Sequence, residues 1–420
     1  MKDVPPNTSL SGPDSVDEGS LYTLILGPVI DPGTDTVSQY VIRWGDGQDD
    51  TIPAGELRAS REVIHTYWAG PSSPTITVDL TDEDGTYLAV ATKAVTVNAL
   101  PPSRLQGLVW EDFNDDGEVN FGEKAIGGVE VHLTGTDYRG RAVDILMATN
   151  SDGIFEFPDL RPGEYTLTET QPAGYVDGKD SLGTVNGTPS GDATVNDQFS
   201  GIRLPQPGSD GVNYNFGERP AAGGQVSTGQ TATIGFWQNK NGQALIKALN
   251  GGPTSTQLGA WLAATLPNMY GASAGACSLA GKTNAEVAGI YTSLFKRNAN
   301  TSPGGPPKLD AQVLAVALAV YVTDADLAGT TAVSYGFSVT EHGVGVSTFD
   351  VGDVNRAAFG LWASESTVLS VMDILLATDS LAHDGLLYDQ NGNHQIDSIE
   401  QALRTRANEV YTAINEHGGI

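Results

Sequence analysis

The sequence predicts a multidomain chain in which two all-β sandwiches are followed by a mainly α-helical domain. The 420 residues are enough for about three domains of ordinary size. The first half consists of short runs of alternating apolar and polar residues between turns rich in Gly, Pro and Asp, and the spacing of apolar residues then becomes helical. The predicted domains are 1–100, 101–219 and 233–420, with a linker at 220–232.

The composition excludes some classes of partner. The chain has 22 Lys plus Arg and 51 Asp plus Glu, which gives a formal net charge of −29. A field of that sign repels nucleic acids and anionic membranes and attracts cations, so we expect no nucleic-acid partner. The longest apolar stretch, 313–322, is shorter than the about 20 residues that span a bilayer. We therefore expect no membrane span and interpret this stretch as a buried helix.

Disulfides cannot stabilise the chain from within, because Cys277 is its sole cysteine. Met1 and Lys2 run directly into a polar segment without the apolar core of a signal peptide. We therefore interpret the chain as a segment of a larger extracellular or cell-surface protein that lacks its signal peptide.

The first domain contains four runs typical of strands, at 23–26, 40–44, 75–80 and 87–97. The sequence Trp44-Gly45-Asp46-Gly47 predicts a tight turn beside a core tryptophan. Together with His65-Thr66-Tyr67, this turn sequence resembles that of the PKD domain, a small module of surface proteins. The resemblance implies an immunoglobulin-like β-sandwich.

The second domain also consists of predicted strands, at 107–113, 128–133, 154–160, 165–170 and 212–218. The stretches VWEDFNDDGEVNFGE, LRPGEYTLTETQPAGYVDG and YNFGE resemble the B domain of serine-aspartate repeat surface proteins. The resemblance implies a prealbumin-like β-sandwich that forms part of an extracellular stalk and binds calcium.

Helices are predicted through the third domain. Thr283 and Glu286 have the spacing of a capping box before an amphipathic run to Phe295. Further helices are predicted at 313–322, 366–379 and 399–416. Residues 235–252 resemble a C-terminal helical module of large multidomain bacterial surface proteins, to which we attach no activity.

Residues 112–123, the first loop, read DFNDDGEVNFGE. Calcium takes about six to eight oxygen ligands, and an EF-hand loop supplies them from positions 1, 3, 5, 7, 9 and 12, with Gly at position 6. Every one of these positions is filled, and Gly117 occupies the sixth. Because a strand precedes the loop, we expect an EF-hand-like loop outside a helix–loop–helix frame; the alternative is an acidic surface turn. The predicted ligands are Asp112, Asn114, Asp116, Glu118, Asn120 and Glu123.

Residues 389–400, the second loop, read DQNGNHQIDSIE and have the same spacing. His394 stands at position 6, where a left-handed residue is needed and a non-glycine costs about 1 kcal/mol. Two Asn replace Asp, so we expect weaker binding, and we expect a helix on each side. The run resembles a single dockerin loop, and the alternative is a polar turn that caps the last helix. The predicted ligands are Asp389, Asn391, Asn393, Gln395, Asp397 and Glu400.

The B-domain resemblance implies two further features. Weaker calcium sites would use loop carboxylates, for which Asp177, Asp180 and Asp197 are the nearest matches. Related collagen-adhesin repeats also form a Lys–Asn isopeptide bond promoted by a residue matching Glu169. The lysines of 101–219 lie outside the first predicted strand, so we expect no such bond and a structural role for Glu169.

No coherent catalytic set is present, and we predict that the chain is not an enzyme. Ser273 lies in a G-x-S-x-G string without a preceding strand, and residues 281–283 lack the first glycine of a phosphate loop. The predicted function is an adhesive or assembly segment of a bacterial surface protein, rigidified by Ca²⁺. Expected partners are neighbouring modules, other surface proteins or extracellular polysaccharide. The alternative is a carbohydrate-binding or docking region of a secreted carbohydrate-active enzyme.

Overall fold

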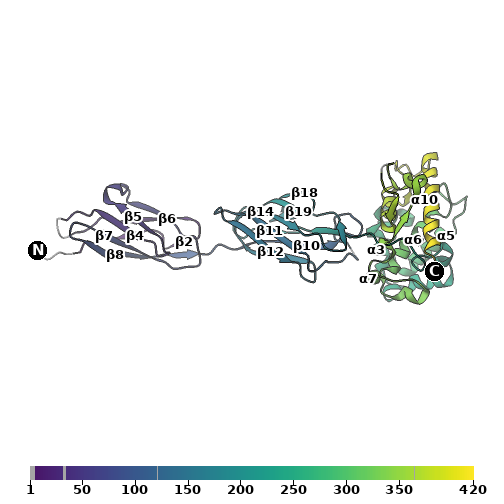
Figure 1. Ribbon diagram of the computed structural model, residues 1–420, viewed down its shortest axis with the longest axis horizontal. Coiled ribbons are helices and arrows are strands. Elements are labelled where there is room, and N and C mark those ends of the chain that lie inside the picture. Colours follow the sequence, from purple (N-terminus) through teal and green to yellow (C-terminus); the bar gives the residue numbers. More distant parts are fainter. Residues whose placement is uncertain (1–4, 32–34, 121, 364) are drawn as a thin grey trace. The chain divides into compact units, whose positions relative to one another are not determined.

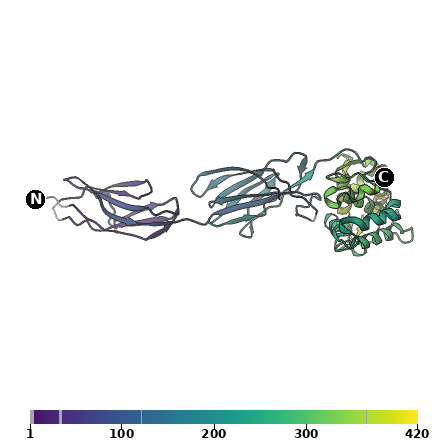
Figure 2. The same ribbon diagram turned by 90° about the horizontal axis from the view of Figure 1, so that it is seen from below.

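The computed structural model describes residues 5–31, 35–120, 122–363 and 365–420. Strands make up the N-terminal part of the chain and helices dominate the C-terminal part (Figures 1 and 2). Contacts within the chain divide it into two compact units. The first is Met1–Arg104 with Pro158–Pro162 and Leu204–Asp210, and the second is Leu105–Phe157, Gly163–Arg203 and Gly211–Ile420.

The first sandwich has a three-stranded sheet in the order β1-β3-β6 and a four-stranded sheet in the order β5-β4-β7-β8. The strands β2 and β9 form a separate parallel pair. The neighbours within the two larger sheets are antiparallel, as expected where short turns join successive strands. The strands are β1 (Leu10–Ser11), β2 (Ser15–Asp17), β3 (Leu21–Leu26), β4 (Gln39–Arg43), β5 (Asp49–Pro53), β6 (Glu62–Thr66), β7 (Thr75–Thr81), β8 (Thr86–Ala94) and β9 (Thr96–Asn98).

Trp44 lies at the centre of the first sandwich. Its side chain is fully buried and stacks on the His65 ring, with 4.4 Å between the ring centroids. Its indole N–H donates to Asp50 at 2.9 Å, so the polar end of the ring is satisfied. The predicted core role of Trp44 is confirmed.

The second sandwich comprises β10 to β21. One sheet has the order β15-β21-β10-β20-β16-β17 with β13 on β10, and the other has the order β12-β11-β14-β19-β18. Phe155, Phe199 and Phe216 pack together in its core, with ring centroids 4.6 and 6.0 Å apart. The strands are β10 (Ser103–Glu111), β11 (Glu130–Asp137), β12 (Ala142–Ala148), β13 (Ile154–Leu160), β14 (Gly163–Glu169), β15 (Tyr175–Asp177), β16 (Thr184–Val185), β17 (Thr188–Pro189), β18 (Asp192–Val195), β19 (Gln198–Leu204), β20 (Asp210–Val212) and β21 (Phe216–Pro220).

The single strand predicted at 212–218 is wrong. β20 ends at Val212 and β21 begins at Phe216, because Asn213 between them has a φ of 63° and turns the chain. The turn lets β21 run parallel to β10 and pair with its end, so that Glu218 lies opposite Glu111.

The helical region packs around one buried helix, α6, all of whose residues are buried. The α-helices are α1 (Ile234–Gln238), α2 (Lys240–Ala248), α3 (Gln257–Thr265), α4 (Pro267–Tyr270), α5 (Asn284–Phe295), α6 (Leu309–Thr323), α7 (Ala325–Ala328), α8 (Gly352–Asn355), α9 (Val371–Ser380) and α10 (Ser398–His417). Short 3₁₀ helices and strand pairs complete the helical region: η2 (Leu249–Gly251), η3 (Gly275–Cys277), η4 (Thr331–Tyr335), η5 (Gly343–Val346), η6 (Arg356–Phe359), β22 (Thr348–Asp350) with β23 (Val368–Ser370), and β24 (Ala382–His383) with β25 (Leu386–Leu387). One further 3₁₀ helix, η1 (Ala54–Glu56), lies between β5 and β6 of the first sandwich.

Three helix predictions hold and one is displaced. The buried helix at 313–322, the helix at 399–416 and the capping box of Thr283 and Glu286 are confirmed. The helix predicted from residue 366 begins only at Val371, because the Ser370 hydroxyl accepts the Asp373 N–H and caps it there. Residues before the cap pair with β22 instead. Within the described residues, no helix has both the length and the apolar character needed to cross a bilayer.

The buried side chain of Arg404 holds α10 against the rest of the helical region. Its side chain is fully buried and donates to the carbonyls of Gly304 and Leu387, each at 2.7 Å, and to Asp310 at 3.3 Å. Each of the three guanidinium nitrogens therefore has an acceptor, as a buried charged group requires.

We predict that Arg404→Ala lowers the free energy of unfolding of the helical region by about 3–5 kcal/mol, because Asp310 and two carbonyls lose a buried donor. Arg406→Ala, on the same helix and only half-buried, is the matched control. Urea unfolding followed by far-UV circular dichroism measures both. Equal losses in the two variants would contradict the prediction.

Candidate metal centres

The first loop folds around its own carboxylates. Asp112 directly follows β10 and is fully buried. Its Oδ1 accepts the N–H of loop position 5 at 3.0 Å and its Oδ2 accepts that of position 6 at 2.9 Å. Glu123, at position 12, accepts the N–H of position 2 at 3.1 Å and that of position 9 at 2.8 Å. The first and last carboxylates are thereby held inside the loop.

The second loop has the same hydrogen bonds at the same positions. Asp389 accepts the N–H groups of positions 5 and 6 at 3.1 and 2.8 Å. Glu400 accepts those of positions 2 and 9 at 3.1 and 2.9 Å. Equal spacing of oxygen-bearing residues has therefore produced two loops with one internal arrangement.

The remaining predicted ligands complete the two loops. Asn114 and Asn120 donate to Asp116 at 2.8 and 2.7 Å. Asp116 in turn accepts the N–H of Glu118 at 2.7 Å. In the second loop the Gln395 N–H donates to Asn393 at 2.8 Å, which matches the contact of Glu118 with Asp116, whereas Asn391 donates to Glu400 at 3.2 Å. The structure thus gathers the twelve predicted residues into two groups of six.

The backbone conformations of the two loops also agree. Positions 4 and 6 have positive φ in both: 55° at Asp115 and 80° at Gly117, then 65° at Gly392 and 59° at His394. His394 therefore adopts the left-handed conformation that glycine adopts in the first loop, and the departure from the expected residue does not alter the path of the chain.

The flanks of the second loop differ from the prediction. Helix α9 ends at Ser380, and the hairpin of β24 and β25 lies between it and the loop, so the expected entering helix is not adjacent. On the leaving side, Asp397 accepts the N–H groups of Ile399 and Glu400 at 2.8 and 2.9 Å and caps α10. The sequence offered a polar turn that caps the last helix as the alternative to a calcium loop. The structure shows the cap together with the same internal hydrogen bonds as in the first loop.

The donors and charges of both loops fit calcium. The ligand side chains offer oxygen, the atom that calcium prefers. Burial, together with the charges of Asp112 and Asp116, raises the pKa of Glu123 to about 7 despite hydrogen bonds that lower it. Burial likewise raises the pKa of Asp112. A bound dication would offset this crowding of charge. The first loop is the more acidic, with five carboxylates (Asp112, Asp115, Asp116, Glu118 and Glu123) against three (Asp389, Asp397 and Glu400).

A third group of carboxylates, the carboxylate cluster, consists of Glu169, Asp197 and Glu218. Their oxygens lie within 4.8 Å of one another. Neither oxygen of Glu169 has a hydrogen-bond partner among the described residues, and Glu218 accepts from Gln171 through only one oxygen. Asp180 borders the cluster and accepts the N–H groups of Gly217 and Asp197, each at 3.2 Å.

Burial raises the pKa of Glu169, and the charge of Glu218 adds to this shift. Burial also raises the pKa of Glu218, with a contribution from the charge of Asp197. Burial also raises the pKa of Asp180 to about 7. Asp197 belongs to this cluster and Asp180 accepts its N–H, so two of the three residues that the B-domain resemblance suggested lie here. Burial, together with the charge of Asp177, raises the pKa of Asp197 to about 6. The two glutamates were not predicted as ligands, because they come from strands of different sheets and only folding brings them together.

Residues 177–180 connect the cluster with the first loop. The N–H of Lys179 donates to Oδ2 of Asp112 at 3.3 Å, while the next residue, Asp180, accepts hydrogen bonds at the cluster. The other lysine of this sandwich, Lys124, forms an ion pair with Asp326 rather than approaching Glu169. Both acidic sites therefore lie at one end of the second sandwich.

Within the second unit, the first loop also contacts the helical region. Phe113, at position 2, belongs to the hydrophobic core of that region. A Cβ on Gly122, at position 11, would lie 2.7 Å from Leu327 and 3.0 Å from Trp261. Ion pairs of Lys124 with Asp326 and of Arg219 with Asp373 flank these contacts. The conformation of the loop and its packing on the helices are therefore coupled.

Residues 104–217 match the family model of the SdrD B-like domain. The predicted likeness of the second domain to B domains is therefore confirmed. Serine-aspartate repeat-containing protein F of Staphylococcus epidermidis is 29% identical over 198 residues, 41% of this chain and 11% of that protein. Serine-aspartate repeat-containing protein C of Staphylococcus aureus strain Newman is 38% identical over 76 residues, 18% of this chain and 8% of that protein. The chain spans about a tenth of the length of these curated relatives.

Two solved structures also resemble parts of the chain. The PKD domain of an M14-like peptidase from Thermoplasmatales archaeon SCGC AB-540-F20 is 25% identical, with 23% of this chain and 98% of that chain covered and a TM-score of 0.19. BcpA, the major pilin subunit of Bacillus cereus, is 11% identical, with 52% and 70% covered and a TM-score of 0.23. At these TM-scores neither likeness bears on the fold.

We predict that the metal-free chain loses stability as the pH rises. The raised carboxyl pKa values mean that the folded state holds protons more strongly than the unfolded state. The stability that these carboxyl groups contribute is fully present at pH values below their ordinary pKa, and it is lost as the pH rises through about 7. The expected loss between about pH 5 and about pH 8 is about 2–4 kcal/mol.

Calorimetric melting in chelator measures this loss, and the slope should be shallower in Glu169→Gln, which removes one titrating group from the cluster. A melting temperature that rises with pH, or an unchanged slope in the variant, would contradict the prediction.

Proposed function

We propose that the chain is a non-enzymatic structural segment of an extracellular bacterial surface protein, and that calcium in its EF-hand-like loops rigidifies it. It would serve as a spacer, adhesive element or assembly unit, with neighbouring modules, other surface proteins or extracellular polysaccharide as partners. The observation that carries the proposal is the double role of the first loop, whose carboxylates point inward while Phe113 and Gly122 pack against the helices.

Calcium would act by removing repulsion. Asp112, Asp116 and Glu123 accept hydrogen bonds from backbone N–H groups, from asparagine amides and, at Glu123, from the indole N–H of Trp110. A dication held by Asp112, Asn114, Asp116, the carbonyl of Glu118, Asn120 and Glu123 would neutralise them. Binding to the folded form alone stabilises it by about 2.7 kcal/mol at a hundred times the dissociation constant.

The stabilised loop would then hold the joint between the second sandwich and the helices. Phe113 is next to Asp112 in sequence, so opening of the loop would withdraw its ring from the helical core. The carboxylate cluster, tied to Asp112 through Lys179, offers a further place where calcium would relieve repulsion. The likeness to serine-aspartate repeat proteins, a group of surface proteins, supports an extracellular location.

Calorimetric calcium titration of the metal-stripped chain tests the proposal. We predict that Glu123→Gln and Glu400→Gln each abolish one class of sites, because position 12 supplies a bidentate carboxylate. Glu118→Ala and Gln395→Ala are matched controls that should retain binding, since position 7 coordinates through its backbone carbonyl. An absence of binding heat, or heat that neither glutamine variant changes, would refute calcium rigidification.

A second experiment separates calcium binding by the first loop from the effect of that binding on the stability of the helical region. In a Glu400→Gln background, calcium at the first loop should raise the melting temperature of the helical region, and Phe113→Ala should abolish that shift while the loop still binds calcium. Val119→Ala, in the same loop but with its side chain exposed, is the control. Differential scanning calorimetry with and without calcium gives the result. A shift that persists in Phe113→Ala would show that the ring does not transmit the effect.

A further inference from the structure

His394 is the one residue of the second loop that the calcium pattern does not explain. Its φ of 59° belongs to the region that favours glycine, and glycine stands at the same position of the first loop. Its imidazole offers nitrogen, which calcium does not prefer. A second chemistry at this position would account for the side chain.

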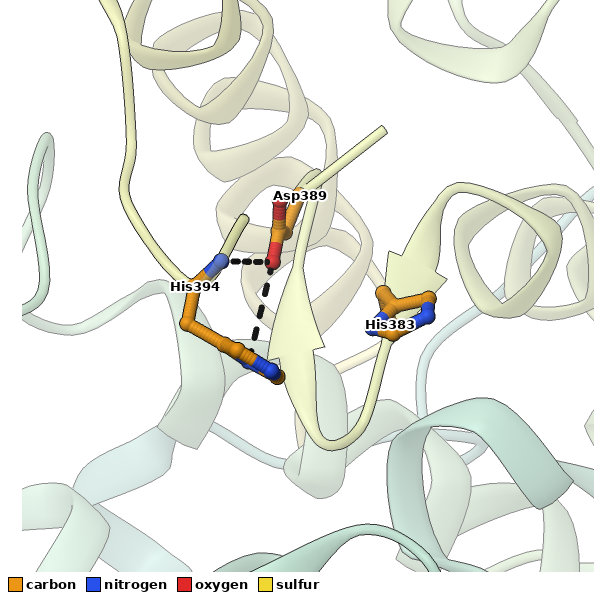
Figure 3. A group of neighbouring side chains, drawn as sticks. All are labelled: His383, Asp389 and His394. Carbon is orange, nitrogen blue, oxygen red and sulfur yellow. Dashed lines mark hydrogen bonds and ion pairs between the residues drawn. The ribbon is translucent and has the colours of Figure 1, made fainter. Parts of the chain in front are cut away.

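A second histidine lies against the same loop. His383, in β24, faces His394 with ring centroids 5.7 Å apart. Its ring also packs against Gly392, where an added Cβ would lie 3.2–3.4 Å from three ring atoms. Figure 3 shows the three side chains, with the His394 ring and Asp389 joined by a dashed line. Ligand atoms of these three residues lie within 4.8 Å of one another.

We propose that His383, His394 and Asp389 form a site for a transition-metal dication of the zinc class. Imidazole and carboxylate ligands suit zinc, copper and nickel. Zinc binds nitrogen at about 2.0–2.1 Å and carboxylate oxygen at about 2.0–2.2 Å in tetrahedral geometry, which places two ligand atoms about 3.4 Å apart. Nδ1 of His394 lies 3.9 Å from Oδ2 of Asp389, so a small rotation of the imidazole brings the pair to this separation.

The surroundings give the site one fixed and two adjustable ligands. The Asp389 carboxylate is buried and oriented by two backbone N–H groups, whereas the side chains of His383 and His394 are 50% and 61% exposed. Rotation of the exposed rings can close the remaining distance. Oδ2 of Asp384 lies 3.4 Å from Nδ1 of His383 and 3.8 Å from Nε2 of His394, where it can orient both rings.

The site shares Asp389 with the second loop, so zinc and calcium would influence each other there. The proposal does not depend on calcium binding, because neither imidazole belongs to the oxygen ligand set. Glu400→Gln removes a calcium ligand and leaves the three proposed zinc ligands in place. A failure of calcium binding at this loop is therefore distinguishable from a failure of zinc binding.

Isothermal titration of the tag-free, metal-stripped full chain with ZnCl₂ tests the site. We expect one zinc per chain at this site, with affinity reduced about 10-fold or more in both His383→Ala and His394→Gly. The glycine variant suits the left-handed backbone and should fold normally, which its melting temperature will check. His132→Ala, which removes an exposed histidine paired with Asp144 elsewhere, and Glu400→Gln should bind zinc as the unmodified chain does. An absence of zinc binding, or affinity unchanged in both the His383 and His394 variants, would overturn the proposal.

Discussion

Repulsion between buried carboxylates at one end of the second sandwich is the constraint on which the rest of the second unit depends. Asp112 is fully buried, Glu123 sits in a loop that raises its pKa, and Glu169 and Glu218 meet with few donors between them. Backbone N–H groups compensate part of this charge, and no intrachain disulfide can offset the remaining loss of stability, because the chain has one cysteine. A protein organised in this way is stabilised most effectively by protons or by cations.

The position of this charge gives it mechanical significance. The first loop leaves β10, closes around its carboxylates and inserts Phe113 among the helices. The second loop has the same internal hydrogen bonds but leads into α10 through the cap formed by Asp397. The same loop motif therefore occurs in two settings: in the first loop Phe113 packs into the helical core, and the second loop leads into the terminal helix, which Arg404 holds against the core.

Local features were predictable from the sequence and long-range ones were not. The two loops follow from the spacing of residues within twelve positions, and the caps at Thr283 and the buried helix α6 follow from equally local patterns. The pairing of Glu169 with Glu218 depends on the assembly of two sheets, which no local pattern reveals. Phe113 was visible as an apolar residue inside an acidic loop, yet its partners lie far away in the chain.

The start of α9, at Val371 rather than at residue 366, also depends on a contact between segments that are distant in the sequence. Residues 366–370 have helical periodicity, but pairing with β22 and the Ser370 cap prevail over it. Likewise, His394 departs from the sequence pattern of a calcium loop without changing the backbone. The pattern identified the loop, and the structure shows that the ring of His383 lies against that of His394.

The most direct test of the central claim is the width of a distance distribution across the joint. Spin labels at Leu146→Cys on β12 and Thr405→Cys on α10, both exposed positions, would be introduced in a Cys277→Ser background and measured by double electron–electron resonance. If calcium in the first loop stiffens the joint, the distribution narrows when calcium is added and does not narrow in Glu123→Gln. Equal widths with and without calcium, or equal narrowing in Glu123→Gln, would contradict the claim.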